Sequence, residues 1–410
     1  MERSNTVSEN IYDCIVIGAG ASGLFYAASD SDIARDSGRK LILEKTSHPG
    51  RKLLMSGNGM CNITHAGPIK DFIGKYGDNG RLIRTCLYKH SNMELMKMME
   101  DIGVPLITRE DGKVFPASMK ARDVLDALLT AVNNNNWEIR IDSQVTAIHQ
   151  SEHDKENIDV TLSDGAMLRA RKLVIATGGA SYPSTGSDGT FFDVLSRDLG
   201  LDIVTPAPAL TPVFVQDFKY EKLAGVSFDD VRITLGKHVE TGPMLITHRG
   251  FSGPAVLHIS QYVHPGDTMT IGYLPDLTPD ELLAKIKSDM PGNKTGAANY
   301  IAAEFGVPKA FAVTLFEHPE MKLSSVGMKE IRKAAMTLTG AEYSVSGTGG
   351  WNDAMVTRGG VALGWIDLRT MRIKDATCDI RIIGEALDIN GNTGGYNLQF
   401  AYSSAMAAHC

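Results

Sequence analysis

A glycine-rich segment near the start constrains this chain more than any other feature. Residues 13–17 form an apolar run, the pattern of a strand buried on both faces of a parallel sheet. A hexamer of small residues, G-A-G-A-S-G, follows at positions 18–23 and leads into a small-residue helical pattern through Ala28. A second apolar run at residues 41–43 then ends at Glu44. Strand, glycines, helix, strand and acid in this order are the fingerprint of a dinucleotide-binding β-α-β unit.

Each glycine of that fingerprint has a physical role. Gly18 allows the tight turn, Gly20 lets the backbone approach a pyrophosphate, and Gly23 lets helix and strand pack closely. The helix N-terminus offers unpaired N–H groups to the phosphates, and Glu44 can accept hydrogen bonds from a ribose. The polar residues 30–40 lengthen the crossover beyond the usual ~20 residues. An ordinary tight turn would not need the terminal acid, so we expect a bound dinucleotide.

Composition narrows the class of protein. The 410 residues suffice for two or three domains, and the formal charge of −7 gives no general attraction to nucleic acid or anionic membranes. The five cysteines are scattered, without a C-x-x-C pair, which predicts free thiols in a reducing compartment. The polar start resembles no signal peptide, and no apolar run reaches the ~18 residues of a membrane span. We therefore expect a cytoplasmic protein with no metal site and no membrane contact.

Residues 50–62 contain three glycines, two cations and short polar side chains. Arg51 and Lys52 can offset pyrophosphate charge, while Ser56 and Asn62 can hydrogen-bond to ribityl or ring atoms. The alternative is a solvated glycine-rich loop. Cys61 has no partner cysteine nearby, which favours a small buried residue over a redox thiol.

Short strands follow a helical stretch at residues 81–132. They are expected at 137–141, 145–148, 158–162 and 167–169, with a hairpin signal at 163–165. A buried strand at 173–177 then ends at Gly178 and Gly179. This order is typical of FAD-binding folds of the glutathione-reductase type, in which Val145 would offer its backbone to the adenine. The fold class expected is α/β, with a Rossmann-like FAD-binding domain.

The composition changes near Pro206, where prolines cluster and alternating strands begin. Residues 205–354 are interpreted as an insertion that supplies substrate contacts: a β-rich domain (205–277 and 337–354) interrupted by a helical domain (278–336). The discontinuous FAD-binding domain comprises 1–204 and 355–410.

The chain returns to the cofactor with a strand at 380–383 that ends at Gly384 and Glu385. An acid in this place, Glu385 or Asp388, can hold a ribityl hydroxyl. The Gly394-Gly395 start of the last helix can aim its positive end at the flavin N1/O2 edge. Taken alone, this would be an ordinary glycine-capped helix.

These loops resemble the BaiN/RdsA family of NAD(P)/FAD-dependent oxidoreductases along nearly the full chain. The matching motifs lie at 50–62, 178–187, 247–254, 356–361, 384–385 and 394–398. The chain departs from the family pattern at two positions: the family usually has an arginine where this chain has Met60, and a glycine where it has Phe191. The resemblance implies a bound FAD, a β-barrel-like insert and a small helical domain. Its members are reported to reduce a bile-acid intermediate, to form dihydrouridine in ribosomal RNA, or to oxidise a small amine.

The candidate site residues follow from these motifs. Those expected to bind the cofactor are Gly18, Ala19, Gly20, Ala21, Ser22, Gly23, Glu44, Lys45, Arg51, Lys52, Ser56, Gly57, Gly59, Cys61, Asn62, Val145, Ala176, Thr177, Gly178, Gly179, Gly384, Glu385, Asp388, Gly394, Gly395, Tyr396, Asn397 and Leu398. Candidates for protonation or substrate orientation are His248, Arg249 and Tyr182. A surface histidine is the alternative for His248.

The function expected is hydride transfer between FAD and an unassigned small organic substrate. A second strand–glycine–helix unit is missing from the sequence, so NADH or NADPH would visit the flavin transiently, or electrons would pass from the substrate to oxygen. Alternatives are an rRNA uridine reductase (dihydrouridine synthase), a small-amine oxidase and a non-enzymatic redox sensor. RNA binding would need a basic face, for which Lys322, Lys329, Arg332 and Lys333 are modest candidates because residues 205–344 carry 13 Lys+Arg and 15 Asp+Glu.

Overall fold

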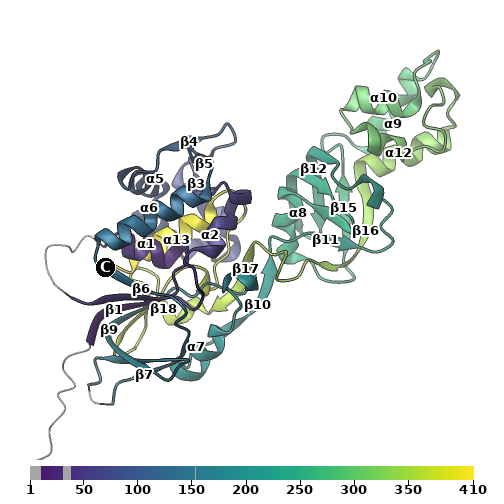
Figure 1. Cartoon of the computed structure of the whole chain (residues 1–410). Coiled ribbons are helices and arrows are strands. Elements are labelled where there is room, and N and C mark those ends of the chain that lie inside the picture. The colour runs from purple at the N-terminus through teal and green to yellow at the C-terminus, as the bar shows by residue number, and fades with distance from the viewer. Residues whose placement is uncertain (1–10, 31–37, 153) are drawn as a thin grey trace, which may run out of the picture. The chain divides into compact units, whose positions relative to one another are not determined.

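The computed structural model describes residues 11–30, 38–152 and 154–410. The chain forms two compact units, Met1–Pro208 with Met355–Cys410 and Ala209–Ala354 (Figure 1). Within the described part of the chain, no helix is both long and apolar enough to cross a membrane.

A mixed sheet forms the centre of the first unit. Its main path is β18-β19-β20-β9-β1-β2-β6, and β7 and β8 extend it from β9, which makes nine strands among the described residues. The strands are β1 (Ile11–Ile17), β2 (Lys40–Leu43), β6 (Trp137–Arg140), β7 (Val145–Gln150), β8 (Ile158–Leu162), β9 (Met167–Ile175), β18 (Ile366–Asp367), β19 (Arg372–Ile373) and β20 (Asp379–Ile382). The central pairs of β1 with β2 and β9, β2 with β6, and β20 with β9 are parallel. This confirms the predicted Rossmann-like α/β class.

Helices and a hairpin cover the two faces of this sheet. Figure 1 shows α1 (Ala21–Ala28), α6 (Ala121–Asn134) and α13 (Tyr396–Ala407) on one side, with α7 (Phe191–Leu199) and the β7–β8 hairpin on the other. β8 pairs antiparallel with both β7 and β9, and the pairing with β9 is the one that the hairpin signal at 163–165 predicted.

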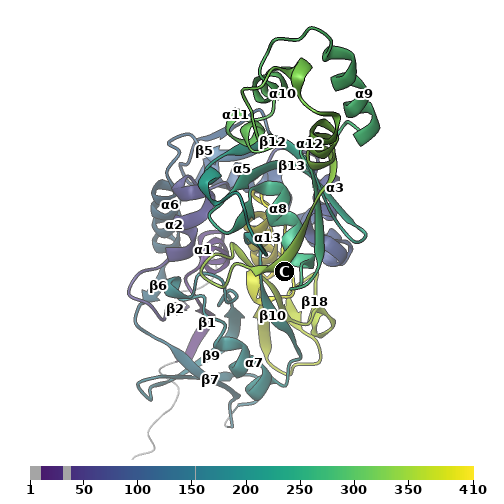
Figure 2. The same ribbon diagram turned by 90° about the vertical axis from the view of Figure 1, so that its right-hand side faces the viewer.

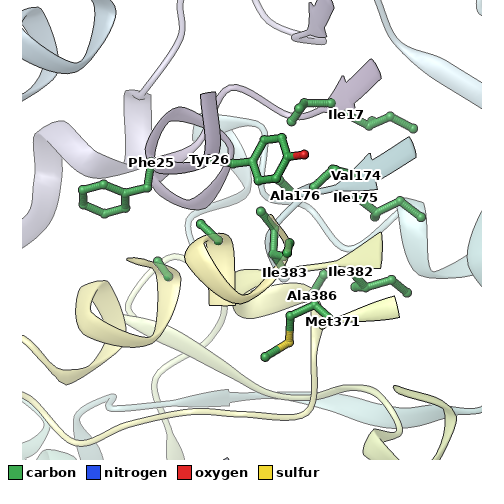
Figure 3. Packing of buried hydrophobic residues seen from close by; sticks show 14 of the residues in the cluster. Ile17, Phe25, Tyr26, Val174, Ile175, Ala176, Met371, Ile382, Ile383 and Ala386 are labelled. Carbon is green, nitrogen blue, oxygen red and sulfur yellow. The ribbon is translucent and has the colours of Figure 1, made fainter. Parts of the chain in front are cut away.

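The core brings three strand ends to the same level. Ile17 pairs with Ile175, and Ile175 pairs with Ile382 (Figure 3). All three side chains are buried, and on the helical side Phe25 packs edge-on against Tyr402 with ring centroids 5.7 Å apart. Because these strands are parallel, the segments that follow them meet at one edge of the sheet.

The connection between β2 and β6 contains a small helical and β subdomain. Its elements are α2 (Arg51–Met55), η3 (Ser56–Gly59), β3 (Thr64–His65), α3 (Ile69–Phe72), η4 (Ile73–Arg81), α4 (Arg84–Lys89), α5 (Asn92–Asp101), β4 (Leu106–Thr108) and β5 (Lys113–Pro116). The expected loop at 50–62 thus begins with a short helix. Gly50, at φ 68°, reverses the chain before it, and Leu53 is buried on its inner face.

The second unit is built on a closed β-barrel. The barrel order is β11-β14-β13-β12-β15-β16, all from residues 209–354 that the structure describes without gaps. Its strands are β11 (Val213–Val215), β12 (Ser227–Leu235), β13 (His238–Ile246), β14 (Gly250–Ser252), β15 (Thr268–Gly272) and β16 (Ala341–Thr348). The predicted barrel-like insert is therefore present.

Helices accompany the barrel: α8 (Pro254–Ile259), α9 (Pro279–Asp289), α10 (Ala297–Phe305), α11 (Lys309–Val313) and α12 (Met328–Gly340). Figure 2 shows α9 to α12 gathered at one end of the barrel. Phe311 of α11 packs on Phe228 and Tyr273, with ring centroids 5.1 and 4.4 Å away, so helices and barrel share a core. A separate helical domain stays a prediction.

Candidate cofactor-binding site

The glycine-rich turn between β1 and α1 is packed so tightly that two of its positions exclude any side chain. Gly18 has φ 104°, and a β-carbon there would lie 2.5 Å from the Ala176 carbonyl oxygen. At Gly23 a β-carbon would lie 2.1 Å from the carbonyl oxygen of Gly18. At Gly20 the nearest atom would be 4.0 Å away, so the space beside this residue is open. The turn thus has the shape that a pyrophosphate requires.

The start of α1 provides hydrogen-bond donors at this open space. Gly20 caps the helix without a side-chain hydrogen bond, so the first backbone N–H groups remain available for a phosphate. The Gly50 N–H donates to the Ala19 carbonyl oxygen at 2.8 Å, which fixes the start of α2 next to the turn. Arg51, the first residue of α2, is exposed.

Glu44 lies where a ribose-binding acid is needed. Its Oε2 accepts the Ala19 N–H at 3.0 Å, and Oε1 accepts the N–H and Oγ1–H of Thr46 at 2.9 and 2.8 Å. A carboxylate offers about four acceptor positions, so one is left for a ribose hydroxyl. The Ser143 N–H donates to the Glu44 carbonyl oxygen at 2.9 Å, which places the segment leading to Val145 beside this acid.

The loop after β9 closes over the same region. A β-carbon at Gly186 would lie 2.9 Å from Thr46, and Lys45 forms an ion pair with Asp188 at 2.8 Å. Lys45 is thereby engaged within the protein. Ser187 has a buried hydroxyl with no hydrogen-bond partner among the described residues, and it lies next to Gly178. An orphaned buried hydroxyl in such a loop fits a polar ligand.

A polar network joins three further segments. Lys52 Nζ donates to Glu385 Oε2 at 2.6 Å and also to Ser181 Oγ. Glu385 Oε1 accepts the Thr357 N–H at 2.8 Å and the Ser181 hydroxyl at 3.0 Å. Thr357 Oγ1 in turn accepts the N–H groups of Ala180 and Ser181 at 2.7 and 3.1 Å.

In this network Lys52 pairs with Glu385, and Glu385 accepts a backbone N–H of β17 (Val356–Val361). The contacts of Lys52 with a pyrophosphate and of Glu385 with a ribityl hydroxyl stay predictions. Sequence reasoning assigned no role to Ser181 and Thr357. Both lie in motifs of the family resemblance, the only signal that pointed to them.

The start of α13 is held by side chains from distant segments. With its amide turned to satisfy both groups, Asn62 accepts the Gly395 N–H at 3.0 Å and donates to the Thr64 carbonyl oxygen at 2.9 Å. Asn397 accepts the Gly391 N–H at 2.7 Å and donates to the Gly391 carbonyl oxygen at 2.8 Å. Asp388 accepts the Gly359 N–H at 3.0 Å. These contacts fix the glycine-rich helix start that was expected to face a flavin.

Cys61 takes the structural part that its isolation suggested. It is fully buried at φ 61°, and burial raises the pKa of its thiol to about 11. A protonated thiol is a poor nucleophile at neutral pH. The neighbouring Ser56 donates to the Leu53 carbonyl oxygen at 2.6 Å, which closes α2.

The three proposed catalytic candidates do not come from one unit. Tyr182 lies in the first unit, half-buried, in the left-handed conformation at φ 55°. His248 and Arg249 are exposed in the turn between β13 and β14 of the second unit, where the Arg249 guanidinium lies 4.3 Å from the Phe214 ring centroid. Their approach to a flavin stays a prediction.

Comparison with known families identifies the family of the chain. The HI0933-like protein Rossmann domain model matches residues 12–410. The chain belongs to this family. The predicted family, a group of FAD-binding Rossmann-fold oxidoreductases, is therefore confirmed, with FAD as cofactor.

Named relatives differ in what they act on. The ribosomal RNA dihydrouridine synthase of Escherichia coli (strain K12) is 31% identical over 405 residues, which is 97% of this chain and 96% of the relative. The 3-dehydro-bile acid delta(4,6)-reductase of Clostridium scindens is 28% identical over 412 residues, 96% of this chain and 97% of the relative. Among solved structures, a 3-ketosteroid-delta4-(5alpha)-dehydrogenase from Rhodococcus jostii RHA1 shares the fold, with TM-score 0.52, 13% identity and 99% of each chain covered.

Proposed function

We propose that this protein reduces a carbon–carbon double bond conjugated to a carbonyl group, with FAD as hydride carrier and NADH or NADPH as electron source. The observation that carries the proposal is the meeting of the glycine turn, Glu44, the loop after β9 and the start of α13 in one unit. The relatives' names add the bond type. Dihydrouridine is uridine saturated at a double bond next to a carbonyl, and a delta(4,6)-reductase saturates the same kind of bond in a steroid.

In this proposal the protein's residues bind and orient. The open space at Gly20 and the N-terminus of α1 hold the diphosphate, and the last acceptor position of Glu44 takes a ribose hydroxyl. The start of α13 would direct its positive dipole end toward a bound flavin ring. FAD, once bound, supplies the hydride chemistry. The Lys52–Glu385 ion pair links α2 to the loop after β20, which keeps these two segments of the proposed cofactor site in place.

Uridine in ribosomal RNA is the first substrate to test. Two relatives of nearly full-length coverage carry the name of a ribosomal RNA dihydrouridine synthase, at 31% and 28% identity. A planar 3-oxo-Δ4 steroid is the second, because the bile-acid reductase is 28% identical. Met60, at a position where the family that the sequence resembles usually has an arginine, lies among the loops proposed to surround the flavin.

Stopped-flow absorbance tests the proposal directly. The purified flavoprotein is mixed with NADH or NADPH, then with protein-free bacterial ribosomal RNA, a 3-oxo-Δ4 steroid or oxygen alone. We expect bleaching of the flavin by one nicotinamide and faster reoxidation by one of the two acceptors than by oxygen, with the reduced product seen by mass spectrometry. Reduction by neither nicotinamide, or reoxidation only by oxygen, would instead support an oxidase or a redox sensor.

A further inference from the structure

Positive charge is concentrated in one part of this acidic chain. Residues 51–89, from the start of α2 to the end of α4, contain seven Lys and Arg against two Asp and Glu, a net charge of +5. The whole chain carries −7, so all other residues together carry −12. A local excess of this kind marks a surface for anionic partners more clearly than the net charge does.

The structure gathers five of these cations on neighbouring elements. α3, η4 and α4 contact one another. The cations are Lys70, Lys75, Arg81, Arg84 and Lys89, which we call the α3–α4 surface. Four of them are exposed, and Lys75 is half-buried. The two acids of the segment, Asp71 and Asp78, are also exposed and keep the local charge from being uniform.

These cations make few contacts with the rest of the fold: Lys89 Nζ donates to Cys410 Sγ at 2.8 Å, and Lys75 lies near the Tyr396 ring. In residues 11–30, 38–152 and 154–410, none of the five forms an ion pair with a carboxylate. The Arg84 guanidinium lies 5.2 Å from the centroid of the Tyr88 ring, which is 45% exposed. An exposed aromatic ring beside a cation offers a nucleic-acid base a stacking partner.

The α3–α4 surface adjoins the loops of the cofactor site. The Asn392 N–H donates to the Lys75 carbonyl oxygen at 2.8 Å, and Lys75 Nζ lies 5.9 Å from the Tyr396 ring centroid at the start of α13. Asn79 Nδ2 donates to the Asp388 carbonyl oxygen at 2.8 Å. A polyanion bound to this surface would therefore lie next to the proposed flavin loops.

We propose that the α3–α4 surface binds the phosphate backbone of structured RNA and presents an unstacked uridine to the flavin. This rests on the proposed function, of which it names the partner-binding face. Enzymes that modify a base must remove it from its stack, so they need backbone contacts beside the active site. RNA is favoured over an anionic membrane for two reasons. The cations lie next to the loops proposed to bind the flavin, and the exposed ring of Tyr88 lies beside one of them, Arg84.

The test compares two sets of cations. The triple variant Arg81→Gln, Arg84→Gln, Lys89→Gln removes three charges from the surface. Its control, Lys329→Gln, Arg332→Gln, Lys333→Gln on α12, removes three cations that are equally exposed. Retention of protein-free bacterial ribosomal RNA on filters is measured from 50 to 200 mM salt. Flavin content and the rate of flavin reduction by the nicotinamide verify that both variants are intact.

Loss of three phosphate contacts should make the negative slope of log K against log salt shallower by about two, and weaken binding at 50 mM salt by about tenfold or more. The α12 variant should bind as the parent does. Equal binding by both variants, or a loss confined to the α12 variant, would overturn the proposal. Binding of the protein to phosphatidylserine vesicles but not to RNA would also overturn the proposal. RNA binding that depends on the α3–α4 surface, without reduction of uridine, would support the RNA-binding surface and contradict only the proposed reaction.

Discussion

The space available for a β-carbon differs among the three glycines of the turn between β1 and α1. Gly18 and Gly23 leave no room for a side chain, whereas Gly20 has open space beside it. The three glycines of one motif therefore serve two purposes, since two of them allow the backbone to pack and the third admits the ligand. Substitution at each position should separate folding from binding.

Replacing Gly23 by alanine should destabilise the first unit by about 1–3 kcal/mol, because the new methyl group would overlap the Gly18 carbonyl. Gly20→Ala should lower the unfolding midpoint of the FAD-free protein only slightly, because alanine caps α1 less well than glycine. It should weaken FAD about tenfold, equal to ~1.4 kcal/mol, since the methyl group enters the pyrophosphate space. Urea unfolding and fluorescence titration with FAD measure the two effects. Equal FAD affinity in Gly20→Ala and the parent would argue against a phosphate at this turn.

Three buried thiols should make the protein less stable toward unfolding in alkaline solution. Burial raises the pKa of Cys14 and of Cys86 to about 12 and that of Cys61 to about 11, from a normal value of 9.0. Because these folded-state pKa values lie above the unfolded one, the stabilising contribution of the thiols is fully present below pH 9. It is lost as the pH rises toward 11 for Cys61 and toward 12 for Cys14 and Cys86.

We therefore expect the free energy of unfolding to fall above pH 9, by about 1 kcal/mol per thiol between pH 9 and pH 10. Urea titrations at a series of pH values measure the slope. Cys86→Ala, although less stable overall, should show a shallower decline than the parent. A stability that is constant or rises from pH 9 to pH 10 would contradict this account.

At the scale of elements, α13 depends on the loop before it. Its N-terminus begins at Gly395, at φ 93°, and the two hydrogen bonds of Asn397 to Gly391 hold the preceding turn. A helix dipole acts only over the first turn, so the placement of that turn controls its effect on a bound flavin.

Asn397→Ala should cost about 1–2 kcal/mol of stability and weaken FAD, because both hydrogen bonds to the turn are lost. Asn134→Ala, an exposed asparagine at the end of α6, serves as the control and should change neither. Calorimetric titration of FAD-free protein with FAD gives the affinity. A variant that loses stability but keeps full affinity would show that the α13 start does not contact the flavin.

At the scale of the whole molecule, the residues proposed to bind FAD all belong to the first unit. Each unit has its own hydrophobic cluster. The chain passes between the two units at residues 208–209 and 354–355. Cores that are separate in this way usually fold independently.

A chain with residues 1–208 joined to 355–410 through a short glycine-serine linker should fold and retain yellow FAD, yet lose substrate turnover. Residues 209–354 alone should unfold cooperatively and bind no FAD. Absorbance spectra and thermal unfolding of the two proteins, with the full chain as reference, give the result. A folded but colourless first unit would place part of the cofactor site in the insert.

Local patterns were enough for the β-α-β fingerprint, the β7–β8–β9 hairpins and the existence of a β-rich insert. Their signals lie within short stretches of chain, since apolar period, turn residues and glycines act on neighbours. The short helix α2 was missed because an expected loop and a five-residue helix share the same glycine-rich composition.

The amino-acid sequence by itself determined that a dinucleotide fold forms and which glycines make its turn, because steric limits on the backbone are local. Only the tertiary structure decided the partners of its charges. Lys52 meets Glu385, 333 residues later; both contact Ser181, and Glu385 also accepts the Thr357 N–H. Coulombic and hydrogen-bond energies depend on distances in space, and these exist only after the strand ends have been brought to one edge of the sheet.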